Sequence, residues 1–514
     1  MPDAKENEPK FRLLESNKIT TLAEDSSGDL WLGTELLGAW KLARSGFTSF
    51  GEKDGIAGTD DIRAIYINPE NEIFIPTRPQ KILHLVDGKF ESVLPFGLTG
   101  RSWGWHFLDF QSRDGEWWIP AMDGLRRYPK VENFKDLAHT PPKKIYTRGD
   151  GLFSSEIFNL FEDSRGDVWI SIIGNDDTLS RWERQTDKIF SYTTGDGLPK
   201  SNGPLSFAED SYGNVWFGFY FGNLARYRDG KFRMFTAKDG IPDSLVGDIL
   251  KDSSGRLWIG TSGRGLFRVD NPNDEKPVFT SISTANGLSS NQIICLVEDR
   301  FRRIYVGTGR GINRIDAAGS IRIFTQADGL PSNYITRCAA DKNGFLWFVT
   351  RNTLVRFSPE IERESAPPPV FIDKIFVNGV AQKISALGET EIKTIELEPD
   401  QKQIQIEFFA LTFGAGENIR YQYRLDRQDW SAPTDQQTLN FDLAPGKHDL
   451  SLRAVRADGA ASEKFAVAQF KILPPVWQRW WFVSLSVLLF SALVYIFYRY
   501  RVAQLLKVER VRTR

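Results

Sequence analysis

The sequence is poor in the two residue types that most often bind metals or act as nucleophiles and bases. Its 514 residues include four histidines and two cysteines, Cys295 and Cys338. Two cysteines are too few for a disulfide framework or a four-cysteine zinc site. They lie four and three residues before Asp299 and Asp341, and this offset by one predicts side chains on opposite faces of adjacent strands. We therefore expect two free cysteines that behave as small buried apolar residues.

Charge of one sign and helical periodicity are also missing. The formal net charge is −1, which gives no electrostatic reason to expect a nucleic-acid partner. The N-terminal residues 1–20 contain no apolar run, so no signal peptide is predicted. No apolar stripe of helical period appears before the C-terminus. The aromatic share of 13%, with 37 Phe, instead favours β structure.

One long apolar run stands at the C-terminus. "WWFVSLSVLLFSALVYIFY", Trp480 to Tyr498, is 19 residues without a charge. As a helix it would be about 28 Å long, enough to cross the hydrocarbon core of a membrane. Tryptophans at one end and tyrosines at the other match the two aromatic belts. The run predicts a transmembrane helix over residues 478–500.

The rest of the chain is dominated by a repeat. "EDSSGDLWLGT", Glu24 to Thr34, returns as "EDSRGDVWISI", "EDSYGNVWFGF" and "KDSSGRLWIGT". Successive copies are 42 to 51 residues apart, and a second marker, "DGL" or a variant of it, recurs between them. The aromatic position of the eight copies falls at Trp31, Phe74, Trp118, Trp169, Trp216, Trp258, Tyr305 and Trp347.

This period indicates either a propeller blade or a helical repeat. The segments between markers are short, rich in β-branched and aromatic residues, and separated by turn residues, as in "RRIYVGT" and "SIRIFTQ". Each unit is therefore predicted to be four strands, one blade of an all-β, seven- or eight-bladed β-propeller spanning residues 10–358. We expect "KFRLLES", Lys10 to Ser16, to close the ring by pairing with the last blade, since an open ring would leave unpaired edges.

The repeated motif itself has a structural interpretation. Its aspartate, such as Asp210 or Asp252, can cap the backbone N–H groups of the next turn. Its glycine supplies a positive φ, and its aromatic residue packs between blades. Adjacent Glu-Asp residues in a strand point to opposite faces, so the pair cannot form a glycosidase dyad.

A second domain follows the propeller. Residues 359–369 form a polar linker that ends in prolines. Residues 370–475 lose the period but keep strands with alternating apolar residues, such as "KQIQIEFFALT". About seven strands in this length predict an immunoglobulin-like β-sandwich.

These patterns together resemble a known family. The repeat "ED-x-x-G-x-LW-IGT" with "DGLP" resembles the two-component regulator propeller repeat. "YQYRLDRQDW" and "LAPGKHDLSLRA" look like the triple-tyrosine domain that follows such propellers in bacterial sensor histidine kinases. The matching positions are Tyr421, Tyr423, Trp430, Pro445 and Gly446, whereas His448 stands where the third tyrosine is expected.

The tail extends this resemblance. Residues 501–514 are predicted to form a basic amphipathic helix that is similar to the start of the signalling helix in these kinases. The phosphoacceptor histidine and the ATP-binding domain, which the resemblance places next, are not present in the sequence. We therefore expect no enzymatic activity of this chain, with a histidine kinase as the activity of the full-length protein.

Other chemistry has weaker support. "DSSGD", Asp25 to Asp29, echoes a calcium loop but lacks the distal bidentate glutamate, and "GTGRG", Gly307 to Gly311, precedes no helix. We expect no cofactor and no metal. The segment that departs most from the repeat is "TGRSWGWHFLDF", and its Arg101, Trp103, Trp105 and His106 are the candidate ligand-binding residues. A degenerate blade filled with core aromatics is the alternative.

Charges around the apolar run predict a topology. Six Lys and Arg residues follow it, against Lys471 and Arg479 before it, which places the C-terminus in the cytoplasm and the propeller outside. Export would require a signal peptide, so we expect this chain to be a fragment that lacks a leader. A cytoplasmic propeller is the alternative, and it contradicts the charge count.

The sequence thus predicts the periplasmic, ligand-sensing part of a single-pass sensor in the bacterial inner membrane. Its expected partners are the membrane, a second copy of the chain and an extracellular ligand, for which an oligosaccharide is the suggested class. Two alternatives are a membrane-tethered carbohydrate-binding or adhesion propeller without signalling output, and a propeller lyase or glycosidase.

Overall fold

The computed structural model divides the chain into two compact units, residues 1–363 with 413–418 and residues 364–412 with 419–514. Regular structure is nearly all β, with one long helix at the C-terminus. The structure describes residues 18–24, 30–36, 38–42, 46–58, 60–62, 64–78, 81–100, 109–172, 178–350, 353–360, 368–411, 419–456 and 461–512.

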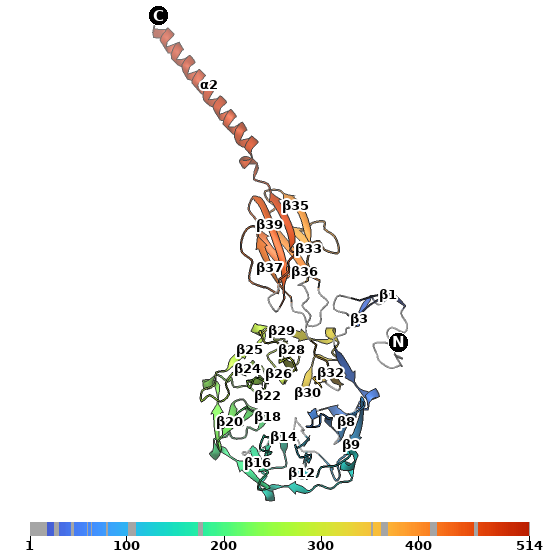
Figure 1. Cartoon of the computed structure of the whole chain (residues 1–514). Helices are drawn as coiled ribbons and strands as arrows, with labels where there is room; N and C mark the ends of the chain where they lie inside the picture. Colours follow the sequence, from blue (N-terminus) through green and yellow to red (C-terminus); the bar gives the residue numbers. More distant parts are fainter. Residues whose placement is uncertain are drawn as a thin grey trace. The chain divides into compact units, whose positions relative to one another are not determined.

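The first unit contains seven antiparallel sheets arranged as a ring (Figure 1). In each sheet the strands follow one another outward from the ring axis, which is the topology of a propeller blade. The blades are β5–β9 (Asp61–Ile62, Tyr66–Ile67, Ile73–Arg78, Ile82–Val86, Lys89–Val93), β10–β13 (Phe110–Gln111, Trp117–Ala121, Gly124–Tyr128, Lys144–Tyr146), β14–β17 (Ile157–Glu162, Val168–Ile172, Leu179–Glu183, Lys188–Tyr192), β18–β21 (Pro204–Glu209, Val215–Phe219, Leu224–Arg228, Lys231–Phe235), β22–β25 (Val246–Lys251, Leu257–Thr261, Gly265–Val269, Thr280–Ile282), β26–β29 (Ile293–Glu298, Ile304–Thr308, Gly311–Ile315, Ile321–Phe324), and β30–β32 with β4 (Ile335–Ala340, Leu346–Thr350, Thr353–Phe357, Phe47–Phe50). The predicted all-β propeller fold is confirmed.

The strand that closes the ring differs from the predicted one. β4 supplies the outer strand of the last blade and pairs antiparallel with β32 from Phe47↔Phe357 to Phe50↔Leu354. The Phe47 ring lies 4.6 Å from that of Phe357, and Phe50 lies 5.6 Å from Trp347. The prediction that residues 10–16 close the ring is therefore wrong, and those residues lie outside the described ones. The sequence contained the signal, because an outer strand precedes each "DGL" marker and β4 precedes the one at Gly55.

The first copy of the repeat does not join the ring. It forms a separate three-stranded sheet of β1 (Ile19–Glu24), β2 (Leu30–Thr34) and β3 (Ala39–Leu42). Its register, with a bulge between Ile19 and Thr21, is the same as in five of the blades, yet all residues of β1 are exposed. Eight copies of the repeat thus give seven blades and one separate sheet among the described residues.

Capped turns explain the second sequence marker. Six blades connect to the next through a short 3-10 turn that is followed by a left-handed glycine; in five of them a Thr or Ser side chain caps the turn, and in the turn at Glu52–Asp54 this position is Gly51. In the turn at Ala237–Asp239, the Thr236 backbone N–H donates to the Asp239 carboxylate and Gly240 takes a φ of 97°. The "DG" of the marker is therefore explained by this turn. Its Asp or Asn bonds back to the Thr or Ser cap three residues earlier, and its glycine takes the left-handed conformation that ends the turn.

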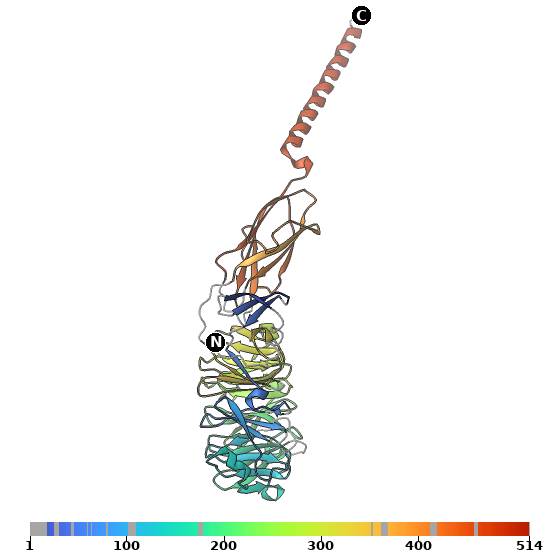
Figure 2. The same cartoon turned by 90° about the vertical axis from the view of Figure 1, so that its right-hand side faces the viewer.

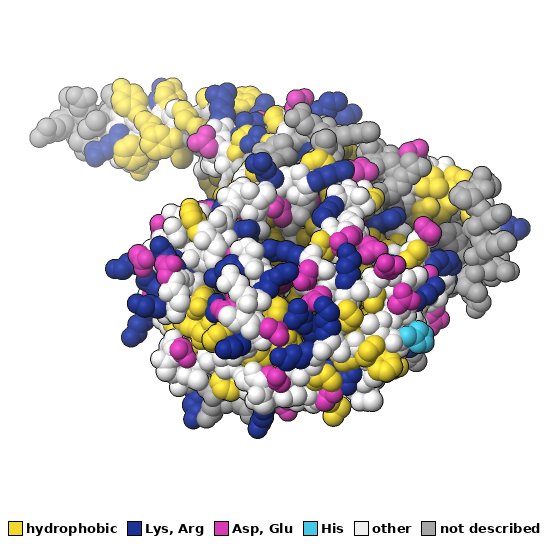
Figure 3. Space-filling model, turned by 60° about the horizontal axis from the view of Figure 1, so that its bottom comes forward, with side chains coloured by type: hydrophobic (Ala, Val, Ile, Leu, Met, Phe, Trp, Pro, Cys, Tyr) yellow, Lys and Arg dark blue, Asp and Glu magenta, His cyan; other side chains and the backbone are white. Residues whose placement is uncertain are grey.

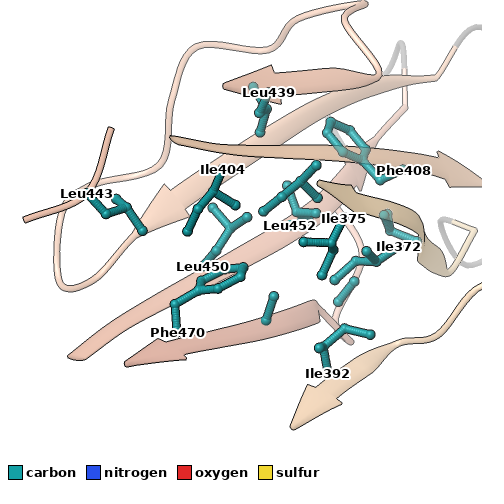
Figure 4. Close-up of a cluster of buried hydrophobic side chains, with 14 of the residues drawn as sticks. Ile372, Ile375, Ile392, Ile404, Phe408, Leu439, Leu443, Leu450, Leu452 and Phe470 are labelled. Carbon is teal, nitrogen blue, oxygen red and sulfur yellow. The ribbon is translucent and has the colours of Figure 1, made fainter. Parts of the chain in front are cut away.

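The second unit is a β-sandwich of two four-stranded sheets, ordered β34-β33-β36-β38 and β35-β40-β39-β37. Figure 4 shows apolar side chains from both sheets meeting between them, among them Phe408, Ile404, Leu450 and Phe470, all of them buried. The strands are β33 (Val370–Val377), β34 (Val380–Ala381), β35 (Glu391–Leu397), β36 (Gln403–Ala410), β37 (Arg420–Leu425), β38 (Thr438–Asp442), β39 (Gly446–Val455) and β40 (Ala466–Ile472).

His448 lies in β39, where it joins the ends of two strands. Its Nδ1 is 3.0 Å from the Asp426 carboxylate and its Nε2 is 2.8 Å from the Ala444 carbonyl oxygen. Both partners are acceptors, so only the charged imidazolium satisfies both ring nitrogens. Burial lowers the pKa of His448, but the carbonyl and the carboxylate outweigh it and the net shift is upward.

This geometry predicts a pH-dependent contribution to stability. A pKa raised in the folded state stabilises the fold below the unfolded value of about 6.5, and this stabilisation is lost as pH rises through the folded pKa. A His448→Gln variant should therefore show a larger loss in unfolding temperature at pH 5.5 than at pH 8.5 by calorimetry. The exposed His139, changed to Gln, is the control. Equal losses for His448→Gln at both pH values would contradict the prediction.

The helix α2 (Trp480–Arg512) ends the chain (Figure 2). Its residues 480–504 are long and apolar enough to cross a membrane, and its apolar side chains are exposed, appearing as the yellow run in Figure 3. It begins two residues after the predicted start, behind a short 3-10 segment, Val476–Gln478, that follows two prolines. The predicted apolar helix is thus present, and it continues as a helix to Arg512, through most of the segment 501–514 that the sequence predicts to be helical.

Candidate functional site

The ring has two faces with different kinds of turn. On one face lie the turns between the first and second strands of each blade, which carry the repeated Glu-Asp motif. On the other lie the turns between the second and third strands, together with the connections from one blade to the next. Figure 2 shows the ring edge-on. The Glu-Asp motif thus lies on the first face, whereas the second face carries the capped "DG" turns and the turns between the second and third strands, whose residues differ between copies.

The repeated aspartate organises its own turn. The Asp210 carboxylate accepts hydrogen bonds from the backbone N–H of Tyr212 and Asn214, from the Asn214 amide, and from Trp216 Nε1 at 2.9 Å. The same indole-to-carboxylate bond joins Trp169, Trp258 and Trp347 to the aspartate six residues before each. All lone pairs of this carboxylate face donors, so it is structural, as the sequence predicted for the turn.

The glutamate before it reaches the neighbouring blade. The Glu209 carboxylate accepts from the backbone N–H and the hydroxyl of Ser164, one blade earlier. Glu298 accepts from Ser253 in the same way. The pair is thus divided between two tasks, with the aspartate folding its own turn and the glutamate fastening the turn of the preceding blade.

Inner strands are joined at a position ten residues before the repeat aromatic. There the Asn159 amide donates to the Leu205 carbonyl, and the Ser206 hydroxyl donates to the Val246 carbonyl. The Asp248 carboxylate accepts from the Leu296 N–H at 2.7 Å. Burial raises the pKa of Asp248 to about 6 although part of the residue remains accessible. Each of these side chains bridges to the inner strand of the next blade.

Cysteine occupies this position in the next blade. Cys295 forms a disulfide with Cys338, and their Cα atoms are 5.8 Å apart. The prediction of two free cysteines on opposite faces is therefore wrong. The alternation rule applies to strands within one sheet, whereas β26 and β30 belong to different blades and face each other. The spacing of the cysteines from the repeat aromatics was the available signal. Cys295 precedes Tyr305 by ten residues, which is the bridging position, and Cys338 precedes Trp347 by nine.

The predicted ligand-binding residues precede β10 in the sequence. Arg101, Trp103, Trp105 and His106 fall outside the described residues, so their assignment stays a prediction. Beside this segment, the Met122 backbone N–H donates to the Gly100 carbonyl. The Met122 side chain is exposed at the adjacent turn.

A polar cavity of about 390 Å³ opens on the same face. It lies between the turn at Asp123 and the connection that includes Arg148. Both oxygens of the Asp123 carboxylate accept a hydrogen bond from the Arg126 guanidinium, at 2.7 and 3.1 Å. The residues that line the cavity include Asp123, Thr147, Arg148, Leu152, Ser154 and Ser155.

The same face presents an aromatic pair that sequence reasoning missed. Tyr220 and Phe221 form the turn between β19 and β20, with ring centroids 4.9 Å apart and planes at 86°. Phe221 is 65% exposed. The signal was available, because "VWFGFYFGN" places two aromatics where other copies have "SGR" or "GR". Tyr334, also exposed, lies on this face in the connection to β30.

Charge and metal-ligand chemistry are unremarkable over the described residues. Figure 3 shows Lys and Arg side chains interspersed with Asp and Glu on the visible surface of the ring. No group of three His, Cys, Asp or Glu side chains in the described part of the chain is placed to hold a metal ion. The second face therefore offers aromatic surface, hydroxyls and single charges, which suit recognition of a polar organic ligand.

Comparison with known proteins identifies the repeat. The family model for the two-component regulator propeller matches residues 13–35, 240–263, 287–310 and 329–352. A histidine kinase of Formosa agariphila, Histidine kinase P4, is 20% identical over an alignment that covers 53% of this chain. The chain spans 25% of that relative's length.

Two solved structures share the fold. Both are extracellular domains of proposed hybrid two-component systems of B. thetaiotaomicron. One is 21% identical with a TM-score of 0.66, covering 89% of this chain and 62% of its own. The other is 18% identical with a TM-score of 0.50, covering 89% of this chain and 63% of its own. The chain thus spans about three fifths of each.

Proposed function

Because the chain carries two-component regulator propeller repeats, we propose that it is the extracytoplasmic, ligand-sensing region of a membrane-bound sensor of the histidine kinase type. The matched repeats carry this proposal, and the similarity to extracellular domains of two-component systems supports it. No kinase core is evident in this chain, so the kinase output belongs to the full-length protein. The triple-tyrosine assignment of the sandwich stays a prediction.

The proposed topology places the propeller and sandwich outside the inner membrane and residues after α2 in the cytoplasm. The Cys295–Cys338 disulfide supports this orientation, because disulfides persist in oxidising compartments such as the periplasm. The excess of Lys and Arg after the apolar run supports it independently. Two physical arguments, one redox and one electrostatic, thus favour the same side.

In this proposal the ligand binds the second face of the ring, and α2 passes the signal across the membrane. A single helix transmits information only by moving relative to a partner, so we propose that the sensor is a homodimer. Ligand binding would change the relative arrangement of the two helices. No catalytic step is required of this chain.

Protease protection tests the topology. Cells producing the full-length protein with an epitope inserted after Arg514 are converted to spheroplasts and treated with proteinase K. The expected result is digestion of the propeller with the epitope protected, and digestion of both after detergent is added. A protected propeller in intact spheroplasts, or an epitope lost without detergent, would overturn the proposed orientation.

A further inference from the structure

We propose that Tyr220 and Phe221 form a stacking platform for a neutral sugar ring, which rests on the proposed function and names the ligand class of that face. The first argument is exposure. Two adjacent aromatic rings, 38% and 65% exposed, stand at a turn of an otherwise well-packed blade. Isolated exposed apolar residues are ordinary, but paired rings at one turn form a contact surface.

The turn is braced from both sides by the connections that enter this blade and the next. The Tyr220 N–H donates to the Gly203 carbonyl, and the Phe221 N–H donates to the Asn202 side-chain oxygen at 2.8 Å. Asn202 is 5% exposed, and its amide also donates to the Gly222 carbonyl. The backbone that carries the rings is therefore tied to the connection that enters the same blade.

The next connection packs against the other side of the turn. Gly222 takes a φ of 86°, and a Cβ there would lie 2.7 Å from both the Asp243 carboxylate and the Ser244 backbone nitrogen. No larger residue fits between the turn and this connection. Asparagine and glycine thus fix the backbone that carries the rings, and a preorganised backbone loses less entropy on binding.

The rings themselves define the ligand chemistry. The face of an aromatic ring is negative, so it attracts the weakly positive C–H hydrogens that a pyranose presents on one side. Because the two aromatic rings are perpendicular, they offer one face and one edge. This arrangement suits a pyranose, which has an apolar side and a polar rim. A flat apolar protein surface would instead call for a larger continuous patch.

The carboxylate of Asp243 sets the charge preference. It is exposed and lies against the turn at Gly222, next to the platform. A carboxylate accepts hydrogen bonds from sugar hydroxyls, whereas it repels the carboxylate of a uronic acid. The arrangement therefore favours neutral glycans over acidic ones.

Affinity electrophoresis of the full-length chain in detergent tests the proposal. The probes are hydroxyethylcellulose, soluble starch, barley β-glucan and polygalacturonate set in the gel, followed by calorimetry with the matching hexasaccharide. We expect retardation by at least one neutral polymer and less by polygalacturonate. Phe221→Ala and Tyr220→Ala should each weaken binding at least about tenfold, as for a central aromatic contact.

Matched variants separate stacking from folding. Phe221→Tyr should keep binding within about threefold, and Tyr212→Ala, an exposed tyrosine at a turn on the opposite face, should leave it unchanged. Asp243→Asn should bring the retardation by polygalacturonate closer to that by the neutral polymers. Unchanged binding by both alanine variants, or no retardation by any neutral polymer, overturns the platform while leaving the protease-protection result intact.

Discussion

An Asp210→Ala variant is expected to lose about 3–5 kcal/mol of unfolding free energy, because one substitution leaves several buried donors unpaired. The Asp210 carboxylate is buried and accepts from two backbone N–H groups, an amide and the Trp216 indole. Alanine restores none of these bonds. Urea unfolding followed by tryptophan fluorescence measures the loss.

Glu209 supplies the control within the same motif. It carries the same charge one residue earlier, but its bonds to Ser164 lie at the surface. Glu209→Ala should therefore cost about 1 kcal/mol or less. Asp210→Asn should fall between the two, since its amide would face the Trp216 N–H. Equal losses for Glu209→Ala and Asp210→Ala would contradict the division of tasks within the Glu-Asp pair.

The second blade allows the reverse experiment. Ser112 stands where six of the eight copies have aspartate, and Trp118 Nε1 is buried without a hydrogen-bond partner in the described part of the chain. Ser112→Asp should supply that acceptor and raise stability by about 1 kcal/mol. A decrease would show that the surroundings of Trp118 have adapted to serine.

Removal of the disulfide is the second change with a large expected effect. The bond joins residues 43 positions apart, and in the chain-entropy model a loop of this length gives about 4 kcal/mol. A Cys295→Ala/Cys338→Ala variant should therefore unfold at clearly lower urea concentration. The reason is the freedom that the unfolded chain regains, added to the loss of a link between the two blades beside the closing strand.

Reduction gives the matching control. Dithiothreitol should lower the stability of the wild-type chain towards that of the double variant and leave the double variant unchanged. A thiol assay on denatured, unreduced wild-type protein should find no free thiol. Two free thiols per chain, or identical wild-type unfolding with and without reductant, would contradict the disulfide and remove its support for a periplasmic propeller.

The sequence by itself determined the blade, because the strand pairs that define a blade are local, apart from the pairing of β4 with β32. The aspartate, glycine and aromatic of the motif act within about ten residues, and the "DG" marker writes a capped 3-10 turn. Hydropathy alone likewise determined the apolar helix, since a run of 19 uncharged residues has no other ready explanation. These features follow from spacing and composition.

Only the tertiary structure decided how blades meet. β4 closes the ring although residues 10–16 carry a similar pattern, since strand pairing depends on which segment reaches the edge of the last blade. The disulfide and the Asn159, Ser206 and Asp248 bridges join different sheets, where alternation along one strand gives no guidance. The aromatic pair at Tyr220 and Phe221 became a surface feature only once the ring placed its turn beside two connections. Contacts between distant segments depend on where the fold brings those segments together, and the repeat period in the sequence does not specify this.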